Sequence, residues 1–137
     1  MANKTPLVMN GGFPQQLQSG DSLSAPSFTI SSMIEMDSGT LTTAATTANQ
    51  VLDLSPIATI RTAKYIVQVT SGTAYYSTEI MLSHNGTVAY ISDSNSIGSN
   101  LLLAGFTCDI SGGNLRLLTT PLNAVTVYKF FATKIVL

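Results

Sequence analysis

The sequence predicts an all-β protein folded as an antiparallel β-sandwich, and three observations support this fold class. Apolar and polar residues alternate along several segments, which is the period of a strand with one buried face. Turn signals separate these segments at intervals of about 8–12 residues, as in sandwiches and barrels. Threonine is frequent, with 18 of 137 residues, and this β-branched residue suits a pleated surface.

Residues 1–30 are predicted to form an extended N-terminal arm, and residues 31–137 the β-sandwich domain. The arm contains a turn-rich break at residues 10–14, Asn-Gly-Gly-Phe-Pro, because glycine permits positive φ and proline fixes its own φ. Its apolar side chains follow no regular period, so they cannot form a buried face of their own. An ordinary surface loop is the alternative. The candidate assembly residues on this arm are Leu7, Phe13, Leu17 and Leu23.

Residues 28–54 are predicted to form a transition between the arm and the clearest strands of the sandwich. Phe28 and Ile30 predict a short strand that could reach Ile34. The run at residues 40–48 contains five threonines and three alanines without a helical apolar stripe, and the sequence leaves residues 40–50 open between strand, helix and loop. Residues 51–54 predict an extended segment that ends at Ser55 and Pro56.

Residues 60–100 show the clearest strand pattern. Tyr65, Val67 and Val69 alternate with polar or less buried positions, and residues 71–72 form a turn signal. Residues 75–84 resume the alternation, with Ile80 and Leu82 directed inward. The following Asn85-Gly86 pair predicts a type I′ hairpin turn, which needs positive φ at both central residues. Residues 87–92 are the expected return strand, and residues 93–100 a polar loop.

The remainder predicts three further strands, at residues 101–110, 115–119 and 124–137. Gly112 and Gly113 mark a tight turn between the first two, and Pro121 interrupts the chain before the last. The predicted sandwich is jelly-roll-like or immunoglobulin-like.

The residues that catalysis needs are scarce. His84 is the one histidine and Cys108 the one cysteine, which excludes a two-histidine metal centre, an internal disulfide and a multi-cysteine zinc site. His84 is expected to hydrogen-bond at the hairpin end, and Cys108 to be a buried small hydrophobe. Asp93 and Asp109 are the acids considered for a sugar-processing enzyme. We predict no enzyme, with no catalytic residue, cofactor or metal.

The charge pattern also limits the partners. Lys, Arg, Asp and Glu make up 9% of the chain, with a net charge of −1 and no basic cluster, which argues against nucleic acid. No apolar run has the length of a membrane span, so no membrane partner is expected. A net charge near zero favours association, and we expect a homotrimer or another homo-oligomer.

Three segments carry a resemblance to a known group of proteins. Residues 61–69, RTAKYIVQV, are similar to a motif that recurs in structural proteins of tailed bacteriophages, of the marine and cyanobacterial type. Residues 79–90, EIMLSHNGTVAY, and 109–118, DISGGNLRLL, match two further blocks. The resemblance covers residues 50–137. It implies a non-enzymatic β-sandwich virion protein, in which Arg61 or Lys64 could pair with Glu79 across adjacent strands.

Several functions fit this resemblance. The first is a capsid decoration or cement protein that stabilises the head shell through contacts with the major capsid protein or other virion proteins. The second is a tail-fibre or baseplate-associated protein that contacts the host surface. A polysaccharide-acting enzyme is a remote third. All place the protein in a virion assembled in the host cytoplasm, and the sequence does not separate head from tail.

Overall fold

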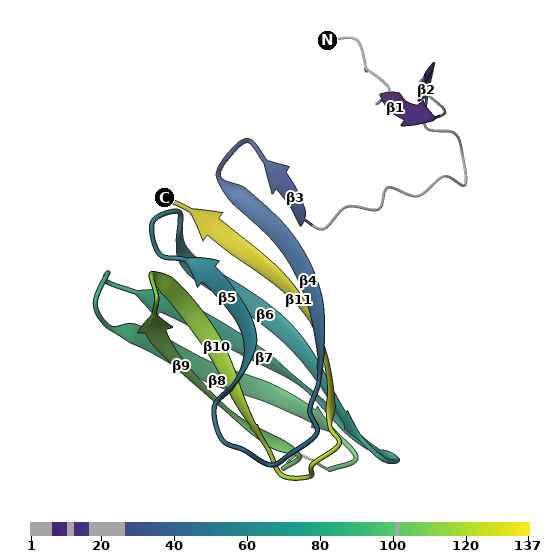
Figure 1. Cartoon of the computed structure of the whole chain (residues 1–137), viewed down its shortest axis with the longest axis vertical. Coiled ribbons are helices and arrows are strands. Elements are labelled where there is room, and N and C mark those ends of the chain that lie inside the picture. The colour runs from purple at the N-terminus through teal and green to yellow at the C-terminus, as the bar shows by residue number, and fades with distance from the viewer. Residues whose placement is uncertain (1–6, 11–12, 17–26, 101) are drawn as a thin grey trace.

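The computed structural model describes residues 7–10, 13–16, 27–100 and 102–137, and it is an antiparallel β-sandwich as predicted (Figure 1). None of these residues forms a helix, and so none forms one long and apolar enough to cross a membrane. The strands are β1 (Leu7–Asn10), β2 (Phe13–Gln16), β3 (Ser27–Ile30), β4 (Ile34–Thr42), β5 (Gln50–Pro56), β6 (Ile60–Ser71), β7 (Ala74–His84), β8 (Ala89–Gly98), β9 (Ala104–Ser111), β10 (Asn114–Pro121) and β11 (Val127–Val136).

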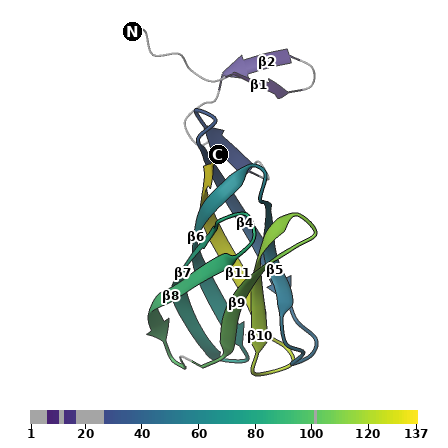
Figure 2. The same ribbon diagram turned by 90° about the vertical axis from the view of Figure 1, so that its left-hand side faces the viewer.

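Two sheets of unequal size form the sandwich. The larger sheet has six strands in the order β3-β4-β11-β6-β7-β8, and the smaller has three in the order β5-β10-β9. All pairs are antiparallel, and β1 pairs with β2 in a two-stranded sheet. Figure 2 shows the layers, with β5, β9 and β10 lying in front of β4, β11 and β6.

The hydrophobic core lies between the two sheets. Tyr65, Val67 and Val69 of β6 are fully buried, as their alternation predicts, and so are Leu115 and Leu117 of β10. Each large side chain removed from water contributes roughly 1.5–3 kcal/mol to the stability of the fold. This packing of alternate residues explains why the middle of the sandwich is readable from the sequence.

The smaller sheet covers only the middle strands of the larger one. The described side chains of β3 are all exposed, and those of β8 are exposed along its length except for the half-buried Ala89. Buried and exposed positions alternate instead along β6, β7 and β11. The larger sheet therefore has two poorly covered margins.

The prediction of a polar loop at residues 93–100 is wrong, because β8 continues to Gly98. This part of β8 pairs with β7 across a bulge between Ser77 and Glu79. The Thr78 hydroxyl, at the bulge, donates a hydrogen bond of 3.0 Å to the Ser94 carbonyl oxygen. Both faces of this edge strand are exposed, so its residues need not alternate between apolar and polar. Its polar sequence therefore resembles that of a loop, which is why the prediction fails here.

Several predicted strand ends differ from the structure. The return strand begins at Ala89 rather than Thr87, the strand after it at Ala104, and the last strand at Val127 rather than Ala124. In the open segment, β4 ends at Thr42 and residues 43–49 form a loop.

Two threonines fix the end of β4. The Thr43 backbone N–H donates to the Thr126 carbonyl oxygen at 2.9 Å, and the Thr126 N–H donates to the Thr43 hydroxyl at 3.2 Å. In the second of these bonds the Thr43 hydroxyl replaces a backbone acceptor of the strand ladder, at the point where β4 ends and before β11 begins.

Candidate functional site

One charged side chain lies inside the sandwich. Among the described residues, Lys134 of β11 is the one Lys, Arg, Asp or Glu that is buried, with 2% exposure. Its Nζ lies 2.8 Å from Asp37 Oδ2 on β4 and 2.9 Å from Asp53 Oδ2 on β5. The Tyr65 hydroxyl donates to Asp53 Oδ2 at 2.9 Å. Because β5 belongs to the smaller sheet, this polar cluster links the two sheets.

The electrostatics of the polar cluster favour a structural role. Burial alone lowers the pKa of Lys134, but the hydrogen bonds and charges of Asp37 and Asp53 outweigh burial and raise it. The pKa of Tyr65 is raised strongly, first by burial and then by the negative charge of Asp53. At neutral pH the ammonium stays charged and the phenol neutral. The cluster therefore offers neither a free amine nucleophile nor a phenolate base.

The predicted partners of Glu79 take different roles. Lys64 Nζ lies 3.0 Å from Glu79 Oε2 in an exposed pair, which confirms the expectation for Lys64. This hydrogen bond, with a second from Asn95, holds the pKa of Glu79 below its usual value. Arg61 instead donates to the His84 carbonyl oxygen at 3.3 Å.

The two acids considered for sugar chemistry lie on different sheets. Asp109 of β9 accepts a hydrogen bond of 2.6 Å from Arg116 Nε, which lowers the pKa of the Asp109 carboxyl. Asp93 of β8 shares with the Ser94 carbonyl oxygen the one proton that the Thr78 hydroxyl donates. Within the described ranges, no group of three or more His, Cys, Asp or Glu side chains could hold a metal ion.

The loop that follows β7 differs from the predicted type I′ turn. Four residues, 85–88, separate β7 from β8, and Gly86 alone among them has positive φ, at 103°. The Asn85 side chain explains this, because its Oδ1 accepts hydrogen bonds from the backbone N–H groups of Thr87 at 3.0 Å and Val88 at 2.8 Å. Asn85 is thus the centre of a side-chain turn rather than a left-handed backbone position.

Both ring nitrogens of His84 are engaged. The ring is 3% exposed. Nδ1 accepts a hydrogen bond of 3.0 Å from the Gly86 N–H, and Nε2 lies 2.7 Å from the Ile60 carbonyl oxygen. His84 therefore joins the hairpin loop to the start of β6, as expected for a histidine at a hairpin end.

The second predicted turn has the expected form. Gly112 and Gly113 have φ values of 57° and 77°, and Ser111 pairs directly with Asn114. Two residues with positive φ between paired strands make a type I′ hairpin. The turn type that the Asn85-Gly86 sequence predicts is formed here instead.

The assembly residues predicted on the arm are only partly within the described ranges. Leu7 lies in β1 opposite Gln16, and Phe13 lies in β2 opposite Asn10. Leu17 and Leu23 lie outside the described residues. The arm range also includes β3, which pairs with β4 at the edge of the larger sheet.

Cys108 is half-buried rather than fully buried, which corrects the prediction. It lies on β9, an edge strand of the smaller sheet, and packs against the rim of the hydrophobic core. Burial, and then the negative charge of Asp109, raise the pKa of its thiol. A raised pKa lowers the thiolate fraction and therefore the reactivity of the cysteine.

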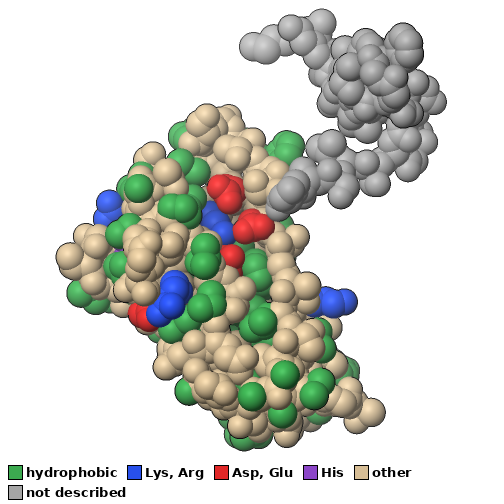
Figure 3. Space-filling model, viewed as in Figure 1, with side chains coloured by type: hydrophobic (Ala, Val, Ile, Leu, Met, Phe, Trp, Pro, Cys, Tyr) green, Lys and Arg blue, Asp and Glu red, His purple; other side chains and the backbone are tan. Residues whose placement is uncertain are grey.

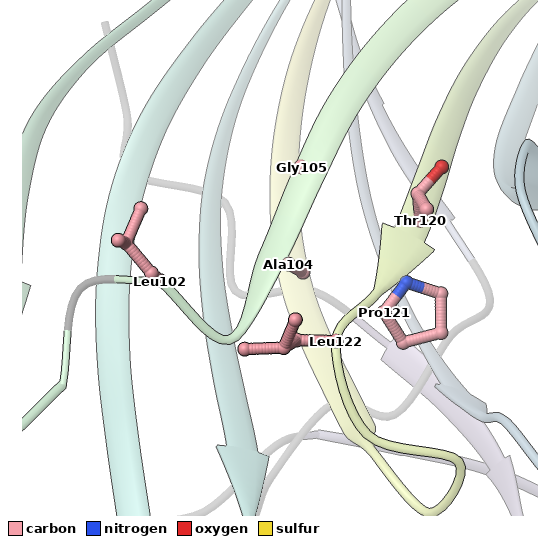
Figure 4. Close-up of a pocket in the computed structure, with 6 residues that line it drawn as sticks. All are labelled: Leu102, Ala104, Gly105, Thr120, Pro121 and Leu122. Carbon is pink, nitrogen blue, oxygen red and sulfur yellow. The ribbon is translucent and has the colours of Figure 1, made fainter. Parts of the chain in front are cut away.

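An apolar pocket lies between the segments that enter β9 and leave β10 (Figure 4). Its volume is about 390 Å³. Its lining residues are Leu102, Ala104, Gly105, Thr120, Pro121 and Leu122. Leu102 and Leu122 are 76% and 64% exposed, and the Leu122 N–H donates to the Leu103 carbonyl oxygen at 2.8 Å. Without titratable groups, this pocket suits contact with apolar surface rather than chemistry.

The outer face of the larger sheet has a second hollow, of about 360 Å³. Its lining residues are Ile66, Ser77, Thr78, Glu79, Asn95 and Ile97. Phe131, which is exposed, lies directly across from Ile66 in the sheet. Figure 3 shows the other side of the molecule, where the smaller sheet lies in front, and there charged side chains form a few small groups between apolar and uncharged polar ones. Such a surface is suited to protein contacts.

The polar cluster around Lys134 is the feature that the sequence reasoning missed. A signal for it exists, because Tyr128, Phe130 and Ala132 alternate along β11 and place Lys134 at the next inward position. A lysine in the inward phase of a strand needs acidic partners. Those partners lie on β4 and β5, far away in the sequence.

No family model and no curated protein matches the sequence. The fold is similar to part of the tailspike protein of Acinetobacter phage vB_ApiP_P1, with a TM-score of 0.50, 16% identity, and coverage of 90% of this chain and 26% of the tailspike. The tailspike protein gp49 of Acinetobacter baumannii bacteriophage Fri1, a capsular polysaccharide depolymerase, is similar with a TM-score of 0.41, 17% identity, and coverage of 74% of this chain and 17% of that protein. This chain therefore spans about a quarter of the length of the first tailspike, and likeness at such identities concerns the fold.

Proposed function

We propose that this chain is a non-enzymatic structural module of a bacteriophage particle, carried on the tail. The observation behind the proposal is the similarity of its fold, over 90% of its length, to part of a phage tailspike protein. The resemblance of residues 61–69, 79–90 and 109–118 to phage structural proteins agrees with a virion location. The neighbour that matches over this length is a tailspike protein rather than a capsid decoration protein, which was our first expectation, so we favour a location on the tail.

The charged side chains and the histidine described above bind other side chains or the backbone, which supports the non-enzymatic part of the proposal. Lys134 is held by two carboxylates, and both ring nitrogens of His84 have partners within the fold. Asp109 is paired with Arg116. A general acid or base for an external substrate needs a free lone pair or proton directed into a cleft, and the apolar pocket beside Leu122 contains no titratable side chain.

The exposed apolar surfaces support a contact role. Leu102 and Leu122 border the apolar pocket, and Val125 in the following loop is 67% exposed. Large exposed apolar groups gathered at one place are typical of a surface that another protein covers. We propose that neighbouring subunits of the particle, including further copies of this chain in a homo-oligomer such as a trimer, cover this surface.

Gold-labelled antibody against the sandwich, imaged on purified phage particles by electron microscopy, tests the location. We expect label on the tail. Label spread over the head shell would overturn the tail assignment in favour of decoration. If mass spectrometry of purified particles does not detect the chain, the virion proposal itself is wrong.

A further inference from the structure

The loop between β7 and β8 contains an asparagine followed by a glycine, a pair with its own chemistry. The backbone nitrogen of the glycine can attack Cγ of the asparagine side chain, and glycine hinders this approach least because it has no Cβ. The reaction needs a base for the attacking N–H, stabilisation of charge on the side-chain oxygen, and a proton for the departing nitrogen. Asn85 and Gly86 have a candidate group for each need.

The first group is an oriented base. His84 Nε2 lies 2.7 Å from the Ile60 carbonyl oxygen, and a carbonyl oxygen only accepts, so Nε2 carries the ring proton. Nδ1 therefore carries the unprotonated lone pair, which accepts the Gly86 N–H at 3.0 Å. The ring is buried and fixed at its far side, the arrangement by which a backbone partner holds a catalytic histidine in one tautomer. The nitrogen that must lose its proton is the one that His84 contacts.

The second group stabilises negative charge. Asn85 Oδ1 accepts three hydrogen bonds, from the Thr87 N–H at 3.0 Å, the Thr87 hydroxyl at 3.0 Å and the Val88 N–H at 2.8 Å. Attack on Cγ moves negative charge onto this oxygen. Donors already directed at the oxygen stabilise that charge without reorganisation, as in an oxyanion hole.

The third group contacts the leaving nitrogen. Asn85 Nδ2 donates a hydrogen bond of 3.2 Å to the Tyr90 hydroxyl oxygen. A phenol both accepts and donates, so Tyr90 can return a proton to the nitrogen as the Cγ–Nδ2 bond breaks. Tyr90 lies on β8 and His84 on β7, so the two strands that flank the loop supply the two proton-transfer groups.

We propose that this loop is a self-modification site at which Asn85 loses its side-chain ammonia. The Gly86 nitrogen forms a bond with Asn85 Cγ and gives its proton to His84 Nδ1. The Cγ–Nδ2 bond breaks, the departing nitrogen takes a proton from the Tyr90 hydroxyl and leaves as ammonia, and the proton on His84 returns through solvent to the Tyr90 phenolate. A solvent water molecule then opens the succinimide to aspartate or isoaspartate. The product has one more negative charge than the original chain, whose formal net charge is −1. This inference does not depend on the proposed function.

The folded and unfolded chains give the first test. Full-length protein is incubated at neutral pH in buffer and in guanidinium chloride, and ammonia loss is followed by isoelectric focusing and by mass spectrometry of the peptide that contains Asn85. We expect faster loss in the folded protein. An ordinary well-bonded loop would restrain the side chain and slow the reaction, so a slower loss in the folded protein overturns the proposal.

His84→Gln gives the second test, because glutamine can accept the Gly86 N–H but is not a base. If His84 is the base, ammonia loss in the folded variant slows by on the order of tenfold or more. If His84 only fixes the loop, its replacement loosens the loop and the rate stays equal or rises, which overturns its role.

A second variant keeps the test decisive if His84→Gln does not fold. Thr87→Val, at an exposed position, removes one of the three donors to Asn85 Oδ1 and leaves the backbone donors in place. We expect ammonia loss to slow several-fold in folded Thr87→Val, while the rate in guanidinium chloride stays unchanged. An unaltered rate in the folded variant overturns the stabilisation of charge at Oδ1.

Discussion

Replacement of Lys134 by methionine tests whether the polar cluster holds the two sheets together. Methionine keeps the length and the apolar stem of lysine but removes the ammonium group. Asp37 and Asp53 would then face each other without the cation that both of them contact. The Tyr65 hydroxyl would remain bound to Asp53, which satisfies one carboxylate oxygen but neutralises no charge.

The size of the expected loss follows from the burial of the three groups. Removal of one partner from a buried ion pair costs about 3–5 kcal/mol. The Asp37 and Asp53 side chains keep 21% and 13% of their exposure, so water still reaches both carboxylates and lowers this figure. We therefore expect Lys134→Met to reduce the free energy of unfolding by about 2–4 kcal/mol.

Urea denaturation followed by far-ultraviolet circular dichroism measures this loss, since the chain has no tryptophan for fluorescence. Lys64→Met is the matched control: its side chain is 50% exposed in the pair with Glu79, and an exposed pair contributes at most about 1 kcal/mol. If the two variants lose the same free energy, the polar cluster does not hold the sheets together and the reasoning fails.

Three other outcomes follow from the same structure. Gly98→Ala would place Cβ in steric overlap with the Tyr75 carbonyl oxygen of β7, and we expect a loss of about 1–3 kcal/mol in unfolding free energy. Gly105→Ala, with no atom within 4 Å of its Cβ, should be near neutral, and equal losses would contradict the close approach. The pKa values of Lys134 and Tyr65 are both raised in the fold, so the stability they add is complete below their ordinary values of 10.5 and 10.0 and is lost as the pH rises through the folded values. The urea concentration at the unfolding midpoint should therefore decrease as the pH rises above 10.0. A midpoint that does not change with pH in this range would show that neither pKa is raised. Deletion of residues 1–26 keeps every strand from β3 to β11; we expect normal circular dichroism but no incorporation into particles, and normal occupancy would exclude the arm as the anchor.

The predictable part of the fold is the part in which one strand face is buried. Ile80 and Leu82 lie inward on β7 as expected, because burial on one face leaves a period of two in the sequence. The second half of β8 has exposed side chains on both faces, so no burial constrains its residues and its sequence could not indicate a strand. The turn at Asn85 differs from its prediction for another reason, because hydrogen bonds to the Asn85 side chain replace the backbone conformation that the Asn-Gly pair favours.

The polar cluster could not be predicted from the sequence because its members come from separate elements. Lys134 and Asp37 are 97 residues apart, and they become neighbours only because β11 pairs with β4. Asp53 reaches them from the other sheet. Pair contacts of this range depend on strand order, which alternation along a single strand does not specify.

The place of β11 in the larger sheet has a consequence for the order of folding during synthesis. β6, β7 and β8 are consecutive in the sequence and adjacent in the sheet, so they can pair as soon as they leave the ribosome. β4 was made earlier, yet it joins them only through β11. The β3–β4 hairpin must therefore wait, with the β4 edge that later pairs with β11 still unpaired, until residues 127–136 emerge. Late, non-local strand pairing is slow, and an unpaired strand edge is open to aggregation, so we expect the nascent chain to be at its most vulnerable just before β11 appears.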